Sequence, residues 1–483
     1  MPTTYRNYVD GEWTEASSGD TIDVQNPADT NEIVARFQDS SEADAVEAIE
    51  AAVAAQDEWA DTPGPERGAI LKQIGNALAE RKEEATETLV KEEGKTRSEA
   101  GGEVQRAIDI FHYYAGKASD LGGVVKSPSG RDKNLSTKRE PLGTVALITP
   151  WNYPIAIPAW KLAPALASGN TLVHKPASAA PNVSRILFEC FEEAGLPAGV
   201  ANFVTGSGSE VGAPLSEHEG IDAVSFTGST AVGTAVAQSA ADDLKRVQCE
   251  MGGKNPTIVM PSADIDEATD IVGVGAFGTT GQSCTACSRA VVHEDVYDEF
   301  VDSITDYANS LDVAPGLDDP DMGPHVSRSE LDETLEYVDV GRKDGATLAA
   351  GGSELSGGEY DDGHYVEPTV FTDVTSDMRV AQEEIFGPVL SVLKVGSFEE
   401  AVEVANDVQY GLSASIVTQD ISEANTFIDE IESGVAKVNE KTTGLELHVP
   451  FGGYKDSSTN TYREQGDAGI DFFTSTKTVY VNY

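Results

Sequence analysis

The chain has 483 residues, too many for one hydrophobic core, so two or more domains are expected. Its 82 acidic and 33 basic side chains give a formal net charge of −49. A potential of this sign repels nucleic acids and anionic membrane surfaces, which excludes both classes of partner.

The acidic residues are spread along the chain and do not form a tail, as "SEADAVEAIE" from Ser41 to Glu50 illustrates. A disordered acidic segment is the alternative, but apolar residues at helical spacing run through the same regions. In molar salt the Debye length falls to roughly 3 Å, which screens the self-repulsion of an acidic, solvated shell. We therefore expect a protein from a salt-accumulating organism.

The start of the chain and the cysteine count give no sign of secretion. "MPTTYRNYVDGEW" has no basic and apolar signal region, and no run of 18 apolar residues follows that could cross a membrane. Four cysteines are too few for a disulfide framework. We expect a cytoplasmic protein with reduced thiols.

Taken in order, the predicted elements change type once. From about residue 42 to residue 121, apolar residues recur at helical spacing. From Gly143, short apolar strands alternate with helices, which favours a parallel, doubly wound sheet that binds a nucleotide at the carboxyl ends of its strands. The predicted strands are residues 144–150, 171–176, 201–206, 223–228 and 246–252.

A second alternating region begins after Asn255 and ends near Lys455, which predicts a second α/β domain. Residues 127–141 and 469–483 are polar-alternating segments with no apparent core of their own, so both are predicted to be extended. They could pair with another subunit as an arm, and we expect a homodimer or homotetramer.

The stretch "FGTTGQSCTACSR" contains Cys284 and Cys287 at C-x-x-C spacing. A zinc site would need two further ligands at compatible spacing, but Cys190 and Cys249 are isolated and the seven histidines form no such cluster. A redox pair would follow the first strand of a thioredoxin-like unit, whereas this pair lies deep in the chain. We therefore expect no metal and interpret one cysteine as a nucleophile, with backbone N–H groups beside it to stabilise an oxyanion.

Six motifs in one order carry a family resemblance. They are the cysteine stretch, "CEMGGKNP", "TPWNYPIAIPAWKLAPALASGN", "FTGST", "QEEIFGPVL" and "PFGGYKDSS". The set resembles the aldehyde dehydrogenase superfamily over nearly the whole chain. The resemblance implies an α/β fold in three parts: a Rossmann-like cofactor domain (1–118 and 142–252), a catalytic α/β domain (253–455), and a small β oligomerisation arm (119–141 and 456–483).

The resemblance also implies a mechanism. Cys284 attacks the aldehyde, the Asn152 amide and the Cys284 N–H hold the oxyanion, and Glu250 activates the water that hydrolyses the thioester. Lys161 and Glu464 match positions of a proton relay. Taken singly, each of these residues is more simply a turn, capping or core residue; taken together in family order, they favour function. Cys287 has no role that the resemblance assigns, and packing is its simplest interpretation.

For the cofactor, the resemblance implies a nicotinamide dinucleotide on the first α/β domain. "TGSGSEVG" is not a proper G-x-G-x-x-G, but the family departs from that fingerprint too. NAD-preferring relatives often carry Glu at the position of Ser178; because serine does not repel a 2′-phosphate, we expect NADP to be preferred and NAD accepted, unless Ser178 merely caps the next helix. The expected cofactor-binding residues are Pro150, Trp151, Lys175, Ser178, Gly208, Gly228, Ser229, Gly233, Glu384 and Phe386.

For the substrate, the "GQSCTA" loop and residues 438–466 most resemble the branch that oxidises 2,5-dioxopentanoate (α-ketoglutarate semialdehyde) to 2-oxoglutarate in pentose and sugar-acid degradation. Succinate semialdehyde is the nearest alternative, but that branch tends to carry an arginine where this chain has Gly278. Betaine aldehyde and aliphatic aldehydes are further alternatives. An inactive binding or structural relative is the remote one, against which the retained Cys284, Glu250 and Asn152 argue.

The expected substrate-binding residues are Arg106, Tyr153, Trp160 and Ser457. The resemblance places Arg106 on the aldehyde tunnel, where its guanidinium could pair with the distal carboxylate of an oxo-acid semialdehyde. The alternative is a surface arginine that pairs with Glu103 or Asp109.

Overall fold

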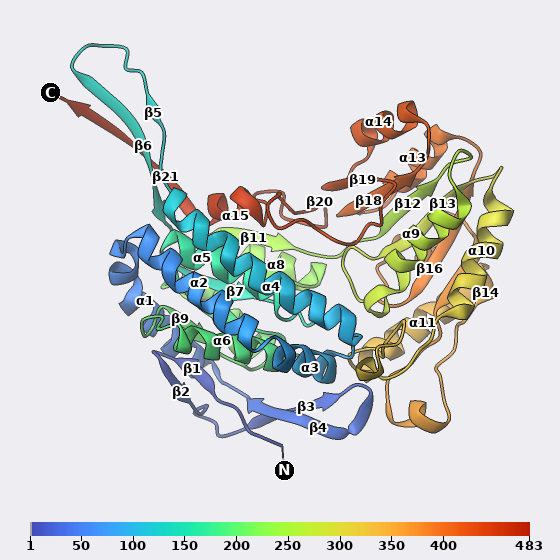
Figure 1. Ribbon diagram of the computed structural model, residues 1–483, viewed down its shortest axis with the longest axis horizontal. Helices are drawn as coiled ribbons and strands as arrows, with labels where there is room; N and C mark the ends of the chain where they lie inside the picture. The colour runs from blue at the N-terminus through green and yellow to red at the C-terminus, as the bar shows by residue number, and fades with distance from the viewer. Residues whose placement is uncertain (1) are drawn as a thin grey trace.

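The structure is a computed structural model that describes residues 2–483, except for the side chain of Glu359. Two lobes, each built around a seven-stranded sheet, lie side by side, and an antiparallel arm projects from the first lobe (Figure 1). The α/β class expected from the sequence is confirmed.

The sheet of the first lobe has the strand order β11-β10-β7-β8-β9-β1-β2. Strands β7 to β11 are parallel and confirm the five predicted strands, whereas β1 and β2 add an antiparallel edge. The bounds are β1 Asn7–Val9, β2 Glu12–Thr14, β7 Thr144–Ile148, β8 Thr171–Lys175, β9 Ala201–Phe203, β10 Ala223–Thr227 and β11 Arg246–Glu250.

Helices cover both faces of this sheet, because alternate strand residues point to opposite sides. Val145, Leu147 and Leu172 pack against α2, α3, α4, α5 and α6, and Ala146 and Val173 pack against α1, α7 and α8. The bounds are α1 Glu42–Asp61, α2 Gly64–Glu80, α3 Lys82–Glu93, α4 Arg97–Lys117, α5 Ala156–Ser168, α6 Asn182–Glu193, α7 Ala213–Glu217 and α8 Thr230–Asp242.

The sheet of the second lobe has the order β14-β15-β16-β13-β12-β18-β19, parallel except for β14. Its strands are β12 Asn255–Val259, β13 Cys287–His293, β14 Thr347–Ala350, β15 Thr369–Val374, β16 Val389–Val395, β18 Ser413–Val417 and β19 Val435–Val438. Its helices are α9 Ile265–Phe277, α10 Tyr297–Ser310, α11 Arg328–Asp344, α12 Arg379–Gln382, α13 Phe398–Asn406 and α14 Ile421–Glu430. The helices α9 and α10 belong to one core cluster, and α13 and α14 to another.

The arm pairs β21 (Thr474–Asn482) with β6 (Lys133–Pro141) over nine residues, and β5 (Val125–Lys126) extends the sheet. Its outer end is exposed: Tyr480 and Tyr483 are 71% and 81% accessible. Subunit pairing through this arm stays a prediction.

The tail corrects one expectation, because residues 469–473 are not extended. They belong to helix α15 (Gly466–Phe472) and the residue that follows it. Ile470 and Phe473, three residues apart, share a helical face that is buried in the core of the first lobe, and this burial decides the local structure. Residues 456–465, which were assigned to the arm, also include side chains buried against the two lobes. We keep the three domain ranges as a proposal.

The sequence predicted no strands in the first 40 residues, where the structure has four. Besides β1 and β2, a hairpin of β3 (Thr21–Asn26) and β4 (Asp29–Gln38) lies below the first lobe (Figure 1). A short pair, β17 (Tyr410–Gly411) and β20 (Tyr454–Lys455), joins the C-terminal segment to the second lobe. None of the helices formed by the described residues has the length and apolar character needed to cross a bilayer.

Candidate active site

A pocket of about 240 Å³ brings together residues from loops at the carboxyl ends of the strands, where parallel sheets place their ligands. Cys284, which follows the 3₁₀ turn Gly278–Gly281, and Asn152, which follows β7, both line it. Six of the expected cofactor-binding residues line the same pocket: Pro150, Trp151, Gly228, Ser229, Glu384 and Phe386.

Six further lining residues were not predicted: Thr227, Met251, Gly252, Glu330, Glu333 and Ile385. Thr227, Met251, Gly252 and Ile385 stand inside the motifs already quoted, so a wider reading of those motifs would have found them. Glu330 and Glu333 come from α11, where they look like any other acidic surface residues in the sequence.

Cys284 is partly exposed to the pocket, and its carbonyl oxygen accepts a hydrogen bond of 2.8 Å from Asn255 Nδ2. The same amide nitrogen also donates to the carbonyl of Ala286 at 2.9 Å, so Asn255 holds the backbone on both sides of Thr285. Burial, together with the carboxylates of Glu384 and Glu250, raises the pKa of the Cys284 thiol. The thiol is therefore neutral until a charge or a ligand in the pocket changes its surroundings.

The Asn152 amide is buried and directed towards the cysteine loop. Its Nδ2 donates to the carbonyl of Gln282 at 3.0 Å, which leaves the second N–H of that nitrogen for a ligand. Its Oδ1 has no partner among the described residues. An amide fixed in this way is preorganised to donate to an oxyanion that forms beside Cys284.

Glu250 ends β11 and is 2% exposed. Its Oε2 accepts the Gly453 N–H at 3.0 Å, and its Oε1 has no partner within the described chain. Burial, reinforced by the carboxylate of Glu464, raises the pKa of Glu250 well above the usual range. Glu464 in turn forms a buried ion pair with Lys161, whose Nζ also donates to Ser225 Oγ at 2.7 Å. Both expected relay residues thus lie close enough to Glu250 to act on its charge.

Lys175 and Ser178 lie together at the end of β8, outside the pocket lining. Lys175 is buried, its Nζ donates to the Pro176 carbonyl at 3.0 Å, and burial lowers its pKa to about 8. Ser178 Oγ donates to the Gly206 carbonyl at 3.1 Å, and Pro181, not Ser178, is the N-cap of α6. The expected Gly208 begins a short helical turn, Gly208–Gly212, that approaches the Lys175 side chain.

The other cofactor candidates shape the pocket wall. Ser229 is the N-cap of α8, and a Cβ atom at Gly233 would meet Met251 Sδ at 2.6 Å. Glu384 accepts the Gly253 N–H at 2.8 Å, and burial raises its pKa to about 7. Phe386, with a φ of 59°, packs edge-on against Trp151 with ring centroids 5.4 Å apart. A phenylalanine held in the left-handed region is a strained backbone position that the surrounding contacts must stabilise.

The four substrate candidates are not brought together by one pocket. Arg106, on α4, is half-buried; its Nη2 donates to Gln465 Oε1 at 3.1 Å, and it has no ion pair among the described residues. Tyr153 reaches Thr279 Oγ1 at 3.5 Å, and Trp160 packs against Phe451. Ser457 is fully buried, and its Oγ accepts the Gly411 N–H at 3.0 Å, a bond that joins the C-terminal segment to the second lobe.

Cys287 lies in the core of the second lobe and does not line the pocket that Cys284 lines. It begins β13, it is 1% exposed, and its Sγ donates to Thr257 Oγ1 at 3.2 Å. Within residues 2–483, no group of three or more His, Cys, Asp or Glu side chains is placed to hold a metal ion.

Comparison with known proteins identifies the family of the chain. The model of the aldehyde dehydrogenase family matches residues 13–479. The chain is 63% identical to the alpha-ketoglutarate semialdehyde dehydrogenase of Haloferax volcanii, with all of both chains covered. It is 47% identical to the alpha-ketoglutaric semialdehyde dehydrogenase of Bacillus subtilis over 99% of this chain and 98% of the relative. The solved structure of Staphylococcus aureus betaine aldehyde dehydrogenase in complex with NAD+ has a TM-score of 0.96 at 35% identity, and the match covers 99% of this chain and 94% of that chain.

Proposed function

Because the chain belongs to the aldehyde dehydrogenase family, we propose that it oxidises 2,5-dioxopentanoate to 2-oxoglutarate through a thioester on Cys284. The observation that carries the proposal is one pocket lined by a cysteine, an oriented amide and six of the expected dinucleotide residues, with a buried carboxylate next to it. The test is an absorbance assay of NAD(P)H formation by the pure protein with a panel of aldehydes. Equal or faster turnover of succinate semialdehyde or betaine aldehyde would contradict the substrate assignment.

The residues divide the reaction into two halves. In the first, the Cys284 thiolate attacks the aldehyde carbon, and the Asn152 amide and the Cys284 N–H stabilise the oxyanion. Oxidised dinucleotide, when bound, supplies the acceptor for the hydride that leaves this carbon. In the second, Glu250 removes a proton from water, the water attacks the thioester, and the Cys284 thiolate leaves. The proton then passes from Glu250 towards Glu464 and Lys161.

Arg106 supports an anionic substrate. In a chain of net charge −49, the half-buried Arg106 guanidinium has a neutral amide, Gln465, as its hydrogen-bond partner among the described residues, while the carboxylates of Glu446 and Asp109 act on it from beyond ion-pair distance. The pairing with Glu103 considered from the sequence is not present, because Glu103 binds Lys95, and Asp109 accepts a bond from Gln105. The Arg106 side chain thus keeps donors for the distal carboxylate of an oxo-acid semialdehyde.

We expect Arg106→Met to lower kcat/KM for 2,5-dioxopentanoate about ten- to a hundredfold, because a charge-assisted bond contributes roughly 1.5–3 kcal/mol. Turnover of an uncharged aldehyde of similar length should change little. Arg97→Met, on the exposed start of the same helix, is the matched control and should leave both values unchanged. Equal losses on both substrates would make Arg106 structural and would remove its support for the substrate.

Lys175 fits the adenosine half of a dinucleotide phosphate. It is a buried ammonium with no carboxylate in ion-pair distance within the described chain, next to a serine that carries no charge. A 2′-phosphate would give that ammonium an anionic partner, and Ser178 does not repel it. We therefore keep NADP as the preferred cofactor, with NAD accepted; the Staphylococcus aureus relative was solved with NAD+.

We expect the protein to have a higher kcat/KM with NADP than with NAD, and Ser178→Glu to reverse that order by at least about tenfold, since like charges brought together cost several kcal/mol. Initial rates with each cofactor at saturating aldehyde measure it. Ser178→Ala removes only the bond to Gly206 and should keep the wild-type order. A wild-type preference for NAD would overturn the cofactor proposal.

Four further predictions stand beside these. They are a place in pentose and sugar-acid degradation, a cytoplasmic location, a homodimer or homotetramer, and dependence on molar salt. Analytical ultracentrifugation in molar salt tests the oligomeric state directly.

A further inference from the structure

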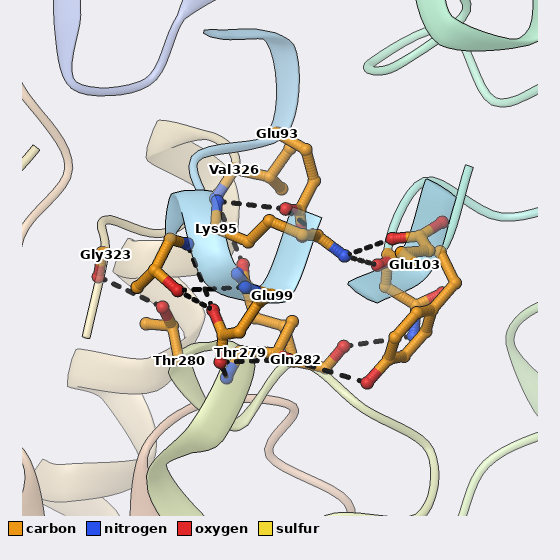
Figure 2. Close-up of polar contacts among 12 residues, drawn as sticks. Glu93, Lys95, Glu99, Glu103, Thr279, Thr280, Gln282, Gly323 and Val326 are labelled. Atoms are coloured by element: carbon orange, nitrogen blue, oxygen red, sulfur yellow. Dashed lines mark hydrogen bonds and ion pairs between the residues drawn. The ribbon is translucent and has the colours of Figure 1, made fainter. Parts of the chain in front are cut away.

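A buried ion pair lies under the turn that carries Asn152. Lys95, between α3 and α4, is 1% exposed, and its Nζ donates to Glu103 Oε2 at 2.7 Å and to the Asn152 carbonyl oxygen at 2.7 Å. Figure 2 shows the Lys95 ammonium directed at the Glu103 carboxylate on α4. The same ammonium lies 4.4 Å from the centre of the Tyr153 ring. The cation therefore contacts two consecutive residues of the turn.

Glu103 holds the other end of the same turn. Its Oε1 accepts the backbone N–H groups of Ile155 and Ala156 at 3.0 and 3.1 Å. They belong to the N-cap residue of α5 and to its first residue, and Ile155 itself provides no side-chain cap. The Glu103 carboxylate thus supplies, from another helix, the acceptor that this helix start lacks.

The Lys95–Glu103 pair forms hydrogen bonds with the backbone of the turn, which an apolar pair could not form. Hydrophobic residues of similar volume would fill the space without the cost of burying two charges. They would, however, leave the Asn152 carbonyl and the Ile155 and Ala156 amides without these partners in a buried region. What the charges add is a fixed position for the turn from 152 to 156.

Helix α4 also supports the opposite side of the oxyanion site. Glu99, one turn before Glu103, accepts the Thr279 N–H at 2.6 Å in the loop that leads to Cys284 (Figure 2). Thr279 and Thr280 both have φ values in the left-handed region, 53° and 56°, which β-branched residues rarely adopt. One helix therefore ties together the two segments that contribute donors to the oxyanion.

We propose that Lys95 is a positioning residue that, anchored by Glu103, holds the Asn152 carbonyl and so aims the Asn152 side-chain amide at the oxyanion. The proposal rests on the role proposed above for Asn152. Lys95 does not touch the reacting atoms, and its effect on the rate passes through Asn152.

The test is a double-mutant cycle on kcat with saturating aldehyde and dinucleotide. Asn152→Ala alone should lower kcat about 10²- to 10³-fold, as loss of an oxyanion donor does. Lys95→Met alone should lower kcat about 10²-fold with KM and dinucleotide affinity unchanged, because a small misplacement of a catalytic group has that effect. Added to Asn152→Ala, Lys95→Met should lower kcat by no more than about threefold. Lys91→Met removes a partly exposed lysine that pairs with Glu87; it is the control and should keep full activity.

If Lys95→Met does not fold, the cycle is run with Lys95→Met/Glu93→Gln/Glu103→Gln, because Lys95 also pairs with the buried Glu93 carboxylate at 3.6 Å. This variant leaves neither carboxylate without its cation and keeps an acceptor for Ile155 and Ala156. Losses that multiply in full in the Asn152→Ala background would overturn the proposal, as would full turnover by either folded variant. An Asn152→Ala protein with wild-type kcat would instead refute the oxyanion role on which the proposal depends, so the two failures are distinguishable.

Discussion

Replacement of Cys284 by alanine is expected to lower the oxidation rate by about 10⁴-fold or more, whereas Cys287→Ala keeps most of it. Cys284 lines the pocket beside the Asn152 amide, so its loss removes the atom that carries the acyl group. Cys287 faces Thr257 inside the second lobe, where alanine leaves a small cavity that costs roughly 1 kcal/mol of stability. Steady-state NAD(P)H formation by the two variants at equal protein concentration measures the difference.

The two variants also decide between the chemical interpretations of the C-x-x-C pair. A zinc clip or a dithiol would need both sulfur atoms, so both variants would then fail to the same degree. Equal loss of activity, or one zinc per chain by elemental analysis, would contradict the assignment of Cys284 as the sole nucleophile. Mass spectrometry of wild-type protein trapped with aldehyde and dinucleotide should place the acyl group on Cys284 alone.

The sequence predicted secondary structure correctly where the local pattern and the tertiary packing favour the same element. The five strands of the first sheet are short apolar runs that end in Gly or Pro, and all five are confirmed. The prediction of an extended tail was wrong at residues 469–473. The spacing of Ile470 and Phe473 suits a helical face as well as an extended segment, and the helix forms because its apolar face is buried in the first-lobe core. The pairing of β1 with distant β9 is information that no local window contains. The β1–β2 hairpin, by contrast, is local, and its Asp10-Gly11 turn, with positive φ at both residues, is a signal that the sequence does carry.

The residues of the candidate site also fall into those that the sequence predicted and those that it did not. Cys284, Asn152 and the glycine-rich turns stand in motifs, so the sequence predicted their shared pocket. The pairing of Lys95 with Glu103 could not be predicted from the sequence, because the two residues stand eight positions apart in a polar stretch. The other partner of Lys95, the carbonyl of Asn152, is a backbone atom, which no sequence motif marks. In a sequence, a buried lysine or glutamate cannot be told from an exposed one; the structure shows that Lys95 is 1% exposed and Glu103 is 5% exposed. Supporting groups of this kind act through contacts that sequence spacing does not encode.

Glu250→Gln is expected to separate the two halves of the reaction. Glutamine keeps an oxygen for the Gly453 N–H but cannot accept a proton from water, so the thioester should form and then persist. Steady-state kcat should fall about 10²- to 10⁴-fold while a burst close to one NAD(P)H per active subunit remains. Rapid-mixing absorbance measures the burst, and intact-protein mass spectrometry measures the trapped acyl group.

The pH profile and an added nucleophile sharpen this prediction. Burial and Glu464 raise the pKa of Glu250, and only its deprotonated form accepts a proton, so wild-type kcat should rise with pH through that pKa. The rise should disappear in Glu250→Gln. Hydroxylamine attacks a thioester without a general base, so it should restore turnover in Glu250→Gln but not in Cys284→Ala. A variant with no burst, whose first turnover is slowed as much as its steady state, would show that Glu250 acts before the thioester forms and not in its hydrolysis.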